Sequence, residues 1–115
     1  MFAHIGLKTK NIPASTQFYK AALAPLDFVP DESGKGFGPK GAPALWFFKG
    51  APTKNAHFAL EAKDRAAVRA FYKAGLKAGG RDNGPPGLRP NYGPKYYAAY
   101  LLDPNGSNIE AVYNK

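Results

Sequence analysis

The chain contains only two histidines, His4 and His57, and they stand at matching positions of an internal repeat. A carboxylate, Glu110, lies in the last segment of the chain. Two imidazoles and one carboxylate can bind Fe(II), Mn(II), Ni(II) or Zn(II) and leave coordination positions open. A metal held in this way can polarise and orient a chelating substrate. These residue types therefore predict a divalent metal site formed by His4, His57 and Glu110.

A purely structural interpretation of the same residues competes with the metal site. Strand histidines can be partly buried and held by hydrogen bonds, and Glu110 can be an ordinary solvated charge. A single histidine would favour that interpretation. Two histidines at equivalent positions, in a chain that has no others, favour the metal.

The repeat also defines the organisation of the chain. Residues 4–23 read HIGLKTKNIPASTQFYKAAL and residues 57–76 read HFALEAKDRAAVRAFYKAGL, with nine of twenty positions identical at an offset of 53. Only two copies of so long a unit indicate a duplicated module and not a solenoid. We expect one domain over residues 1–115, with a first module over 1–52 and a second over 53–115. Matching strands of the two modules can lie side by side, which would let both histidines face one site.

Each module is expected to begin with a strand and continue into a helix. Residues 2–8 and 57–61 alternate in polarity as strands do, with the histidine on the face opposite the aliphatic side chains. The first helix should begin after Asn11, tolerate Pro13 in its first turn and end near residue 23. The second should begin after Asp64 and end at the glycine pair 79–80. Further strands are expected at 28–31, 44–48, 96–102 and 108–113, with another short one within 33–43.

The composition excludes several classes of protein. The chain has no cysteine, which rules out thiolate chemistry and agrees with a reducing cytoplasm. No apolar run is long enough to span a membrane, and no signal peptide is evident. The net charge of +8 favours anionic small molecules. The basic positions 65, 69, 73 and 77 are better explained as a solvated helix face than as a nucleic-acid contact.

The order of elements resembles a known superfamily. A strand, a helix bearing FYKA and further strands occur twice, and the chain ends in DPNGSNIE. This pattern resembles the glyoxalase / bleomycin-resistance / dioxygenase superfamily, also called vicinal oxygen chelate proteins. The resemblance implies an α+β fold of two tandem βαβββ modules that form a curled mixed sheet around a cupped site. It also implies metal ligands at His4, His57 and Glu110.

The chain departs from one branch of that superfamily at Trp46. Glyoxalase I enzymes carry a fourth ligand on the last strand of the first module, where this chain has an indole that cannot bind a metal. The three-ligand pattern looks more like fosfomycin-resistance metalloenzymes or extradiol dioxygenases. The resemblance thus favours a metal-dependent enzyme, of lyase, transferase or dioxygenase type, that acts on a small, oxygen-chelating, anionic substrate. The alternative is a metal-free small-molecule-binding protein of the bleomycin-resistance type.

Further residues are predicted to act on the substrate or to contact it. Glu61 could act as a base, although a salt bridge with its repeat partner Lys8 explains it as well. We also expect a homodimer, because curled sheets leave open edges that a twofold pair would cover. Neither a membrane nor a nucleic acid is expected as a partner. The residues predicted to contact substrate are Trp46, Phe48, Arg89, Tyr92, Lys95 and Tyr97.

Overall fold

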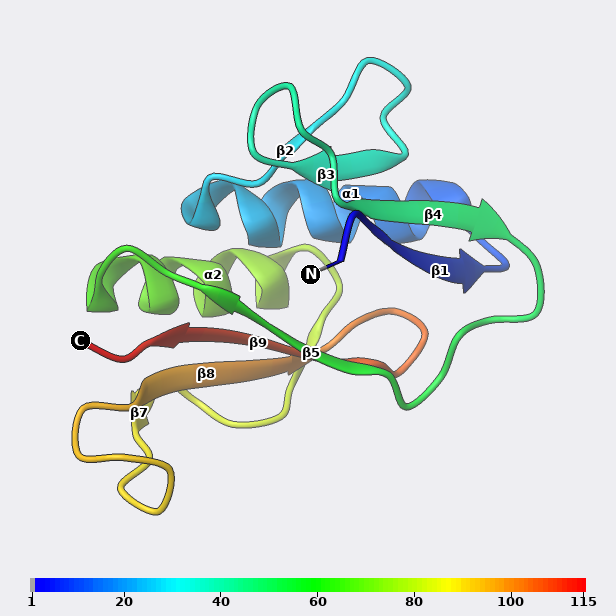
Figure 1. Ribbon diagram of the computed structural model, residues 1–115. Coiled ribbons are helices and arrows are strands. Elements are labelled where there is room, and N and C mark those ends of the chain that lie inside the picture. Colours follow the sequence, from blue (N-terminus) through cyan, green and yellow to red (C-terminus); the bar gives the residue numbers. More distant parts are fainter. Residues whose placement is uncertain (1) are drawn as a thin grey trace.

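The computed structural model describes residues 2–115, which form two sheets and two principal helices (Figure 1). In the first module, sheet A has the strand order β1-β4-β3-β2. In the second, sheet B has the order β5-β9-β8-β6, and β7 also pairs with β8. The first module comprises β1 (Ile5–Thr9), α1 (Ile12–Leu23), the 3-10 turn η1 (Ala24–Leu26), β2 (Val29–Pro30), β3 (Gly36–Gly38) and β4 (Leu45–Lys49). The second comprises β5 (His57–Glu61), α2 (Arg65–Lys77), β6 (Arg81–Asp82), β7 (Gly87–Leu88), β8 (Tyr97–Leu102) and β9 (Asn108–Tyr113).

Both helices begin at the residues that the sequence predicted. The Asn11 side chain accepts a hydrogen bond from the Ala14 amide at 3.0 Å, and Asp64 accepts one from the Ala67 amide at 2.7 Å. These caps satisfy amides that have no partner within the helix. Helix α2 ends just before Gly79, whose φ of +102° only glycine adopts readily. No helix within residues 2–115 has the length and apolar character needed to cross a membrane.

The two helices lie side by side and are packed closely at Gly75 (Figure 1). A Cβ atom at this position would lie 3.3 Å from the Ala22 Cβ of α1 and 2.2 Å from the Leu101 Cδ1 of β8. The absence of a side chain therefore lets α2 approach both α1 and sheet B. The fully buried Phe18 and Phe71, which are repeat partners, lie in the same core.

A buried hydrogen bond joins the modules beside this core. The hydroxyl of Tyr19 in α1 donates to Asp103 Oδ2 at 2.6 Å, and both residues are almost wholly buried. Burial, together with the neighbouring Asp103 carboxylate, raises the pKa of Tyr19 well above its usual value. Asp103 Oδ1 accepts from the Asn105 and Ser107 amides, each at 2.9 Å. The turn between β8 and β9 is thereby fixed against the first module.

The α+β fold and the βαβββ order agree with the sequence-based expectation, but the histidine-bearing strands are not neighbours. Strands β1 and β5 are edges of different sheets. The segment between the modules explains part of this separation, because Thr53 occupies the outer edge of β1. The Lys8 amide donates to Thr53 Oγ1 at 2.8 Å, and the Thr53 amide donates to the Lys8 carbonyl at 2.9 Å. Within one chain, the expected side-by-side arrangement of the two strands is therefore wrong.

Candidate functional site

The open face of sheet B gathers the polar residues of the second module. In the parallel pair β5–β9, His57 stands opposite Asn108, and Ala59 stands opposite Glu110. In the antiparallel pair β8–β9, Tyr100 stands opposite Glu110. Residues that face each other across a ladder project to the same side of a sheet. The other side carries buried apolar residues such as Ile109 and packs on α2.

Glu110 is the centre of this face. Its carboxylate is buried at 3% exposure, with Oε1 3.2 Å from His57 Nε2. Its other oxygen accepts a short hydrogen bond from the Tyr96 hydroxyl. Burial, assisted by this bond and by the Glu110 charge, raises the pKa of Tyr96. A buried carboxylate is stable only with such partners. Tyr96 donates a hydrogen bond to one Glu110 oxygen, and His57 Nε2 lies within ion-pair distance of the other.

A cavity of about 370 Å³ opens over Glu110, and its size suits a small ligand. The Tyr92 and Tyr96 rings meet edge to face with centroids 5.4 Å apart, and the His57 and Tyr100 rings stack at 6.5 Å. The Oδ1 atom of Asn108 is buried and has no hydrogen-bond partner. The lining residues are His57, Tyr92, Tyr96, Tyr100, Asn108 and Glu110.

The donor atoms of this cavity fit a hard or borderline divalent cation. They include a carboxylate, an imidazole and an amide oxygen without a partner, which are ligand types that such ions accept. Within residues 2–115 of one chain, however, no group of three or more His, Cys, Asp or Glu side chains is placed to hold a metal. His4 is exposed just before β1 in the other sheet, so a single chain supplies two of the three predicted ligands.

The open face of sheet A has a different residue at the position equivalent to Glu110. Gly6 and Ala59 are repeat partners; Gly6 pairs with Trp46, whereas Ala59 pairs with Glu110. Trp46 is therefore the counterpart of Glu110, and an indole stands where a fourth ligand would be needed. Phe48, on the same strand face, is 52% exposed.

Of the two tyrosines predicted to contact substrate, one lines the cavity and the other does not. Tyr92 lines the cavity. Tyr97 does not, because it projects towards α2, where the Arg65 guanidinium carbon lies 5.0 Å from its ring centroid. The sequence analysis did not name Tyr96 and Tyr100, which line the cavity instead. The signal that could have found them is the strand alternation of residues 96–102, in which Tyr97 shares the phase of the apolar Leu101.

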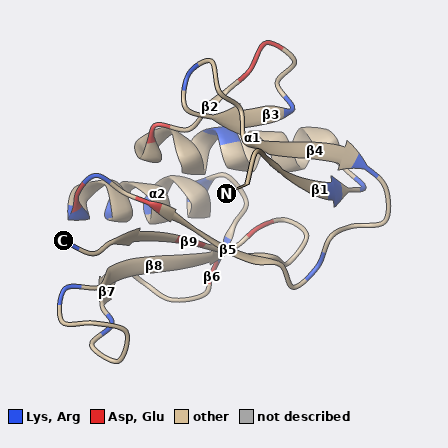
Figure 2. Ribbon diagram, in the orientation of Figure 1, with Lys and Arg blue, Asp and Glu red and all other residues tan. Residues whose placement is uncertain are grey.

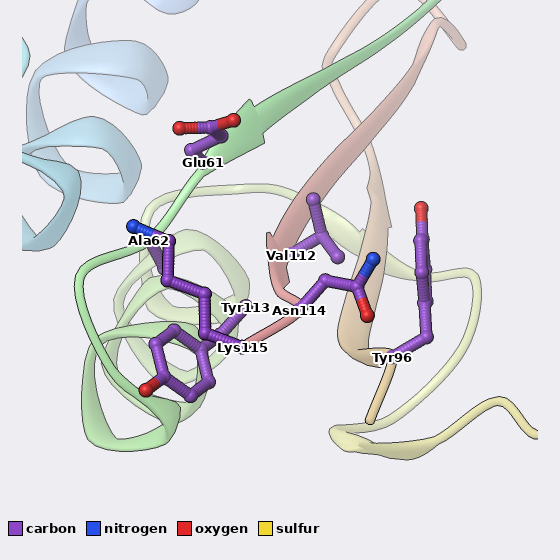
Figure 3. Close-up of a pocket in the computed structure, with 7 residues that line it drawn as sticks. All are labelled: Glu61, Ala62, Tyr96, Val112, Tyr113, Asn114 and Lys115. Atoms are coloured by element: carbon purple, nitrogen blue, oxygen red, sulfur yellow. The ribbon is translucent and has the colours of Figure 1, made fainter. Parts of the chain in front are cut away.

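Glu61, the speculative base, lies outside this cavity. It lines a separate pocket of about 200 Å³, in which Val112 and Asn114 stand between it and Tyr96 (Figure 3). Four residues of β5 separate it from His57, roughly 13 Å at strand spacing. No ion pair joins it to Lys8 in the part of the chain that the structure describes.

The two predicted cations of the second module flank β8. Lys95 is exposed in the turn that precedes the strand. Arg89 follows β7, with its guanidinium carbon 5.3 Å from the Tyr100 ring centroid. Arg89 thus lies against the wall residue Tyr100, but neither Arg89 nor Lys95 itself lines the cavity.

Comparison with solved structures finds this fold in glyoxalase-related proteins. A glyoxalase/bleomycin resistance protein from Albidiferax ferrireducens T118 matches with a TM-score of 0.80 and 25% identity, covering 100% of this chain and 99% of that one. A glyoxalase/bleomycin resistance protein/dioxygenase family enzyme from Burkholderia phytofirmans PsJN matches with a TM-score of 0.76 and 18% identity, covering 98% of each chain. Lactoylglutathione lyase from Agrobacterium tumefaciens matches with a TM-score of 0.66 and 20% identity, covering 97% of this chain and 91% of that one. No family model and no curated protein matches the sequence.

Fold, module order and these neighbours together identify the chain as a member of the glyoxalase / bleomycin-resistance / dioxygenase superfamily, as its motifs predicted. The likeness extends over the whole chain, so both modules belong to the shared fold.

Proposed function

We propose that this protein is a divalent-metal-dependent enzyme whose site forms between two copies of the chain. His57 and Glu110 of one copy and His4 of the other would hold the metal. The observation that carries the proposal is the 3.2 Å contact between Nε2 of the half-exposed His57 and Oε1 of the buried Glu110 at the wall of a cavity. Their partner by sequence repeat, His4, is exposed on a different sheet and free to serve a second copy.

The exposed edges and apolar side chains of sheet A support pairing with a second chain. Strands β1 and β5 are both edge strands, and among the described residues Thr53 bonds to the outer edge of β1 at Lys8 alone. Unpaired strand edges are usually covered. Near His4, the side chains of Phe2 and Ile5 are 87% and 39% exposed. A twofold dimer is the commonest way to bury such a surface, and it would supply each site with both histidines.

The metal, when bound, would supply Lewis-acid polarisation and a template for a substrate with two adjacent oxygens. Tyr96 keeps the Glu110 carboxylate in place through its hydrogen bond. Arg89 supplies positive charge beside the cavity, in a chain whose net charge is +8. These features favour a small, anionic, oxygen-chelating substrate.

The test is metal analysis of protein purified without a histidine tag and reconstituted with Fe(II), Mn(II), Ni(II) or Zn(II). We expect about one metal per chain in the wild type and its loss in His57→Ala and in Glu110→Ala. Glu61→Ala is the matched control, because Glu61 lies on the same strand as His57 but outside the cavity. An unoccupied wild type would contradict the proposal and leave the metal-free binding protein as the better account.

Mixing two inactive variants tests whether the site is shared. A refolded mixture of His4→Ala and Glu110→Ala chains would contain mixed dimers with one intact site and one doubly broken site. Some metal binding should therefore return. If each site lies within one chain, or if light scattering shows a monomer at micromolar concentration, the shared site is wrong.

A further inference from the structure

Two arginine–tyrosine pairs flank strand β8, one on each face of sheet B. The Arg89 guanidinium carbon lies 5.3 Å from the Tyr100 ring centroid, and that of Arg65 lies 5.0 Å from the Tyr97 ring centroid. The pairs have the same chemistry and nearly the same separation. Tyr100 lines the cavity over Glu110 and Tyr97 does not. Arg89 therefore lies against a wall residue of the cavity, whereas Arg65 lies on the other face of the sheet.

Arg89 is held in place without being neutralised. Its Nη2 donates to the Pro85 carbonyl at 2.6 Å, and Nη1 makes a longer contact of 3.5 Å with the Leu88 carbonyl. No carboxylate lies within 4.0 Å of it in residues 2–115. Residues 83–102, which run from the end of β6 through β8, carry Arg89 and Lys95 but no acidic residue (Figure 2). A guanidinium has five donors, so several stay available for a carboxylate.

The cavity walls themselves are aromatic. Tyr92, Tyr96, Tyr100 and His57 supply rings in two groups, one edge to face and one stacked. Aliphatic side chains are absent from the lining of this cavity as the described residues form it. Aromatic rings prefer planar aromatic partners, at about 0.5–1.5 kcal/mol beyond the area that is buried. A flat ring is thus the ligand shape that these walls select over a saturated one.

We propose that this cavity binds planar aromatic carboxylates, with the ring against the tyrosine faces and the carboxylate on Arg89. The inference deepens the proposed function, because it names the substrate class of the same site. It rests on that function for its catalytic meaning, but the binding itself uses residues that are not metal ligands. Tyr100 supplies the stacking surface, and Arg89 sets the preference for an acid.

Three small ligands distinguish the contribution of the aromatic ring to binding from that of the carboxylate charge. Benzoate has both features, cyclohexanecarboxylate keeps the charge without the aromatic ring, and benzyl alcohol keeps the ring without the charge. Titrations followed by amide NMR shifts should rank benzoate tightest, by about 2- to 10-fold over cyclohexanecarboxylate. Benzyl alcohol should bind at least about 10-fold more weakly than benzoate, because a hydrogen bond to a charged group is lost.

Matched variants of the two arginines test which of them contributes to benzoate binding. Arg89→Gln should weaken benzoate binding by about 10-fold or more, whereas Arg65→Gln should leave it unchanged, because Arg65 lies on the other face of the sheet. Circular dichroism of both variants checks the fold, and the comparison of probes on wild type needs no variant. Equal affinities for benzoate and cyclohexanecarboxylate, equal effects of the two substitutions, or no benzoate binding would each overturn the proposal.

Metal content measured on the same samples keeps the two proposals apart. Titrations are run on reconstituted protein and on protein treated with EDTA. Benzoate binding that needs Arg89 in metal-free protein, together with no metal uptake, would contradict the metal enzyme and support the aromatic acid site. Binding of one metal ion per chain without benzoate binding would support the metal enzyme and contradict the aromatic acid site.

Discussion

On the open face of each sheet, three residues lie side by side on three neighbouring strands. The two sheets differ in which of these three positions carries a large aromatic residue. In sheet A the row is Gly6, Trp46 and Gly36; in sheet B it is Ala59, Glu110 and Tyr100. The large aromatic side chain stands on β4, the middle strand of the row in sheet A, and on β8, the last strand of the row in sheet B. The two repeated modules therefore each have one large aromatic residue in this row, but on strands that are not equivalent.

The different position of the large aromatic residue explains why, among the described residues, the carboxylate site lies in the second module. In sheet A the indole lies over Gly36, where a Cβ would come within 2.8 Å of the Trp46 ring. In sheet B the smaller Glu110 leaves room for a cavity. Tyr96 donates a hydrogen bond to its carboxylate, and His57 Nε2 lies 3.2 Å from the other carboxylate oxygen. The side chains of each row fit together sterically. A single substitution in either row should therefore have a specific effect on metal binding or on stability.

The largest expected effect is on metal binding. Glu110→Gln keeps the size of the side chain but removes its charge, and it should lower metal affinity by more than the ~10- to 100-fold that loss of a supporting hydrogen bond causes. Trp46→Phe, at the equivalent position, should leave affinity unchanged, because an indole is not a ligand. Isothermal titration with Zn(II) or Mn(II) compares the two, and equal losses would contradict the asymmetry between the modules.

The repeated tyrosines should differ in their effect on stability. Tyr19→Phe leaves the buried Asp103 Oδ2 without its donor, and we expect a loss of about 1–3 kcal/mol in the free energy of unfolding. Tyr72, its repeat partner, donates to Asp82 at an exposed site, so Tyr72→Phe should change that free energy by less than about 0.5 kcal/mol. Urea unfolding of both variants measures the difference. Equal values would show that the bond between the modules adds nothing specific.

The helix contact gives a third comparison. Gly75 and Ala22 are repeat partners, and a Cβ at position 75 would meet both Ala22 and Leu101. Gly75→Ala places a methyl 2.2 Å from Leu101 Cδ1. Overpacking of this kind costs about 1–3 kcal/mol, partly offset by the ~1 kcal/mol that alanine adds to helix stability over glycine. We expect a modest net destabilisation by thermal unfolding, and the Gly75→Ala/Leu101→Val double variant should recover part of it.

The smallest effect should appear at Gly36. Gly36→Ala forces the half-buried Trp46 ring to move, so its fluorescence emission should shift while stability falls by about 1 kcal/mol. Gly93→Ala is the control, because its nearest neighbours lie 3.8 Å away. An unchanged emission spectrum in Gly36→Ala would mean that the indole does not rest on this glycine.

Local features of the fold could be predicted because neighbouring residues decide them. The caps at Asn11 and Asp64 satisfy amides three residues away, and the DPNG turn bonds within itself. The repeat fixed the equivalence of the modules, and with it the resemblance to the superfamily. Strand existence followed from alternation, although the predicted contact Tyr97 lies on the face of the sheet opposite Tyr96 and Tyr100.

The sequence by itself determined which residues can do chemistry: two repeated histidines, one glutamate and a tryptophan in place of a fourth ligand. Only the tertiary structure decided which of them meet. His57 and Glu110 come together because β5 pairs with β9 in one register, and a shift of one residue would send Glu110 to the opposite face. His4 is separated from them because Thr53 occupies the outer edge of β1 and the two sheets do not join. Strand pairing of this kind depends on hydrogen bonds between residues far apart in the chain, which local pattern does not encode.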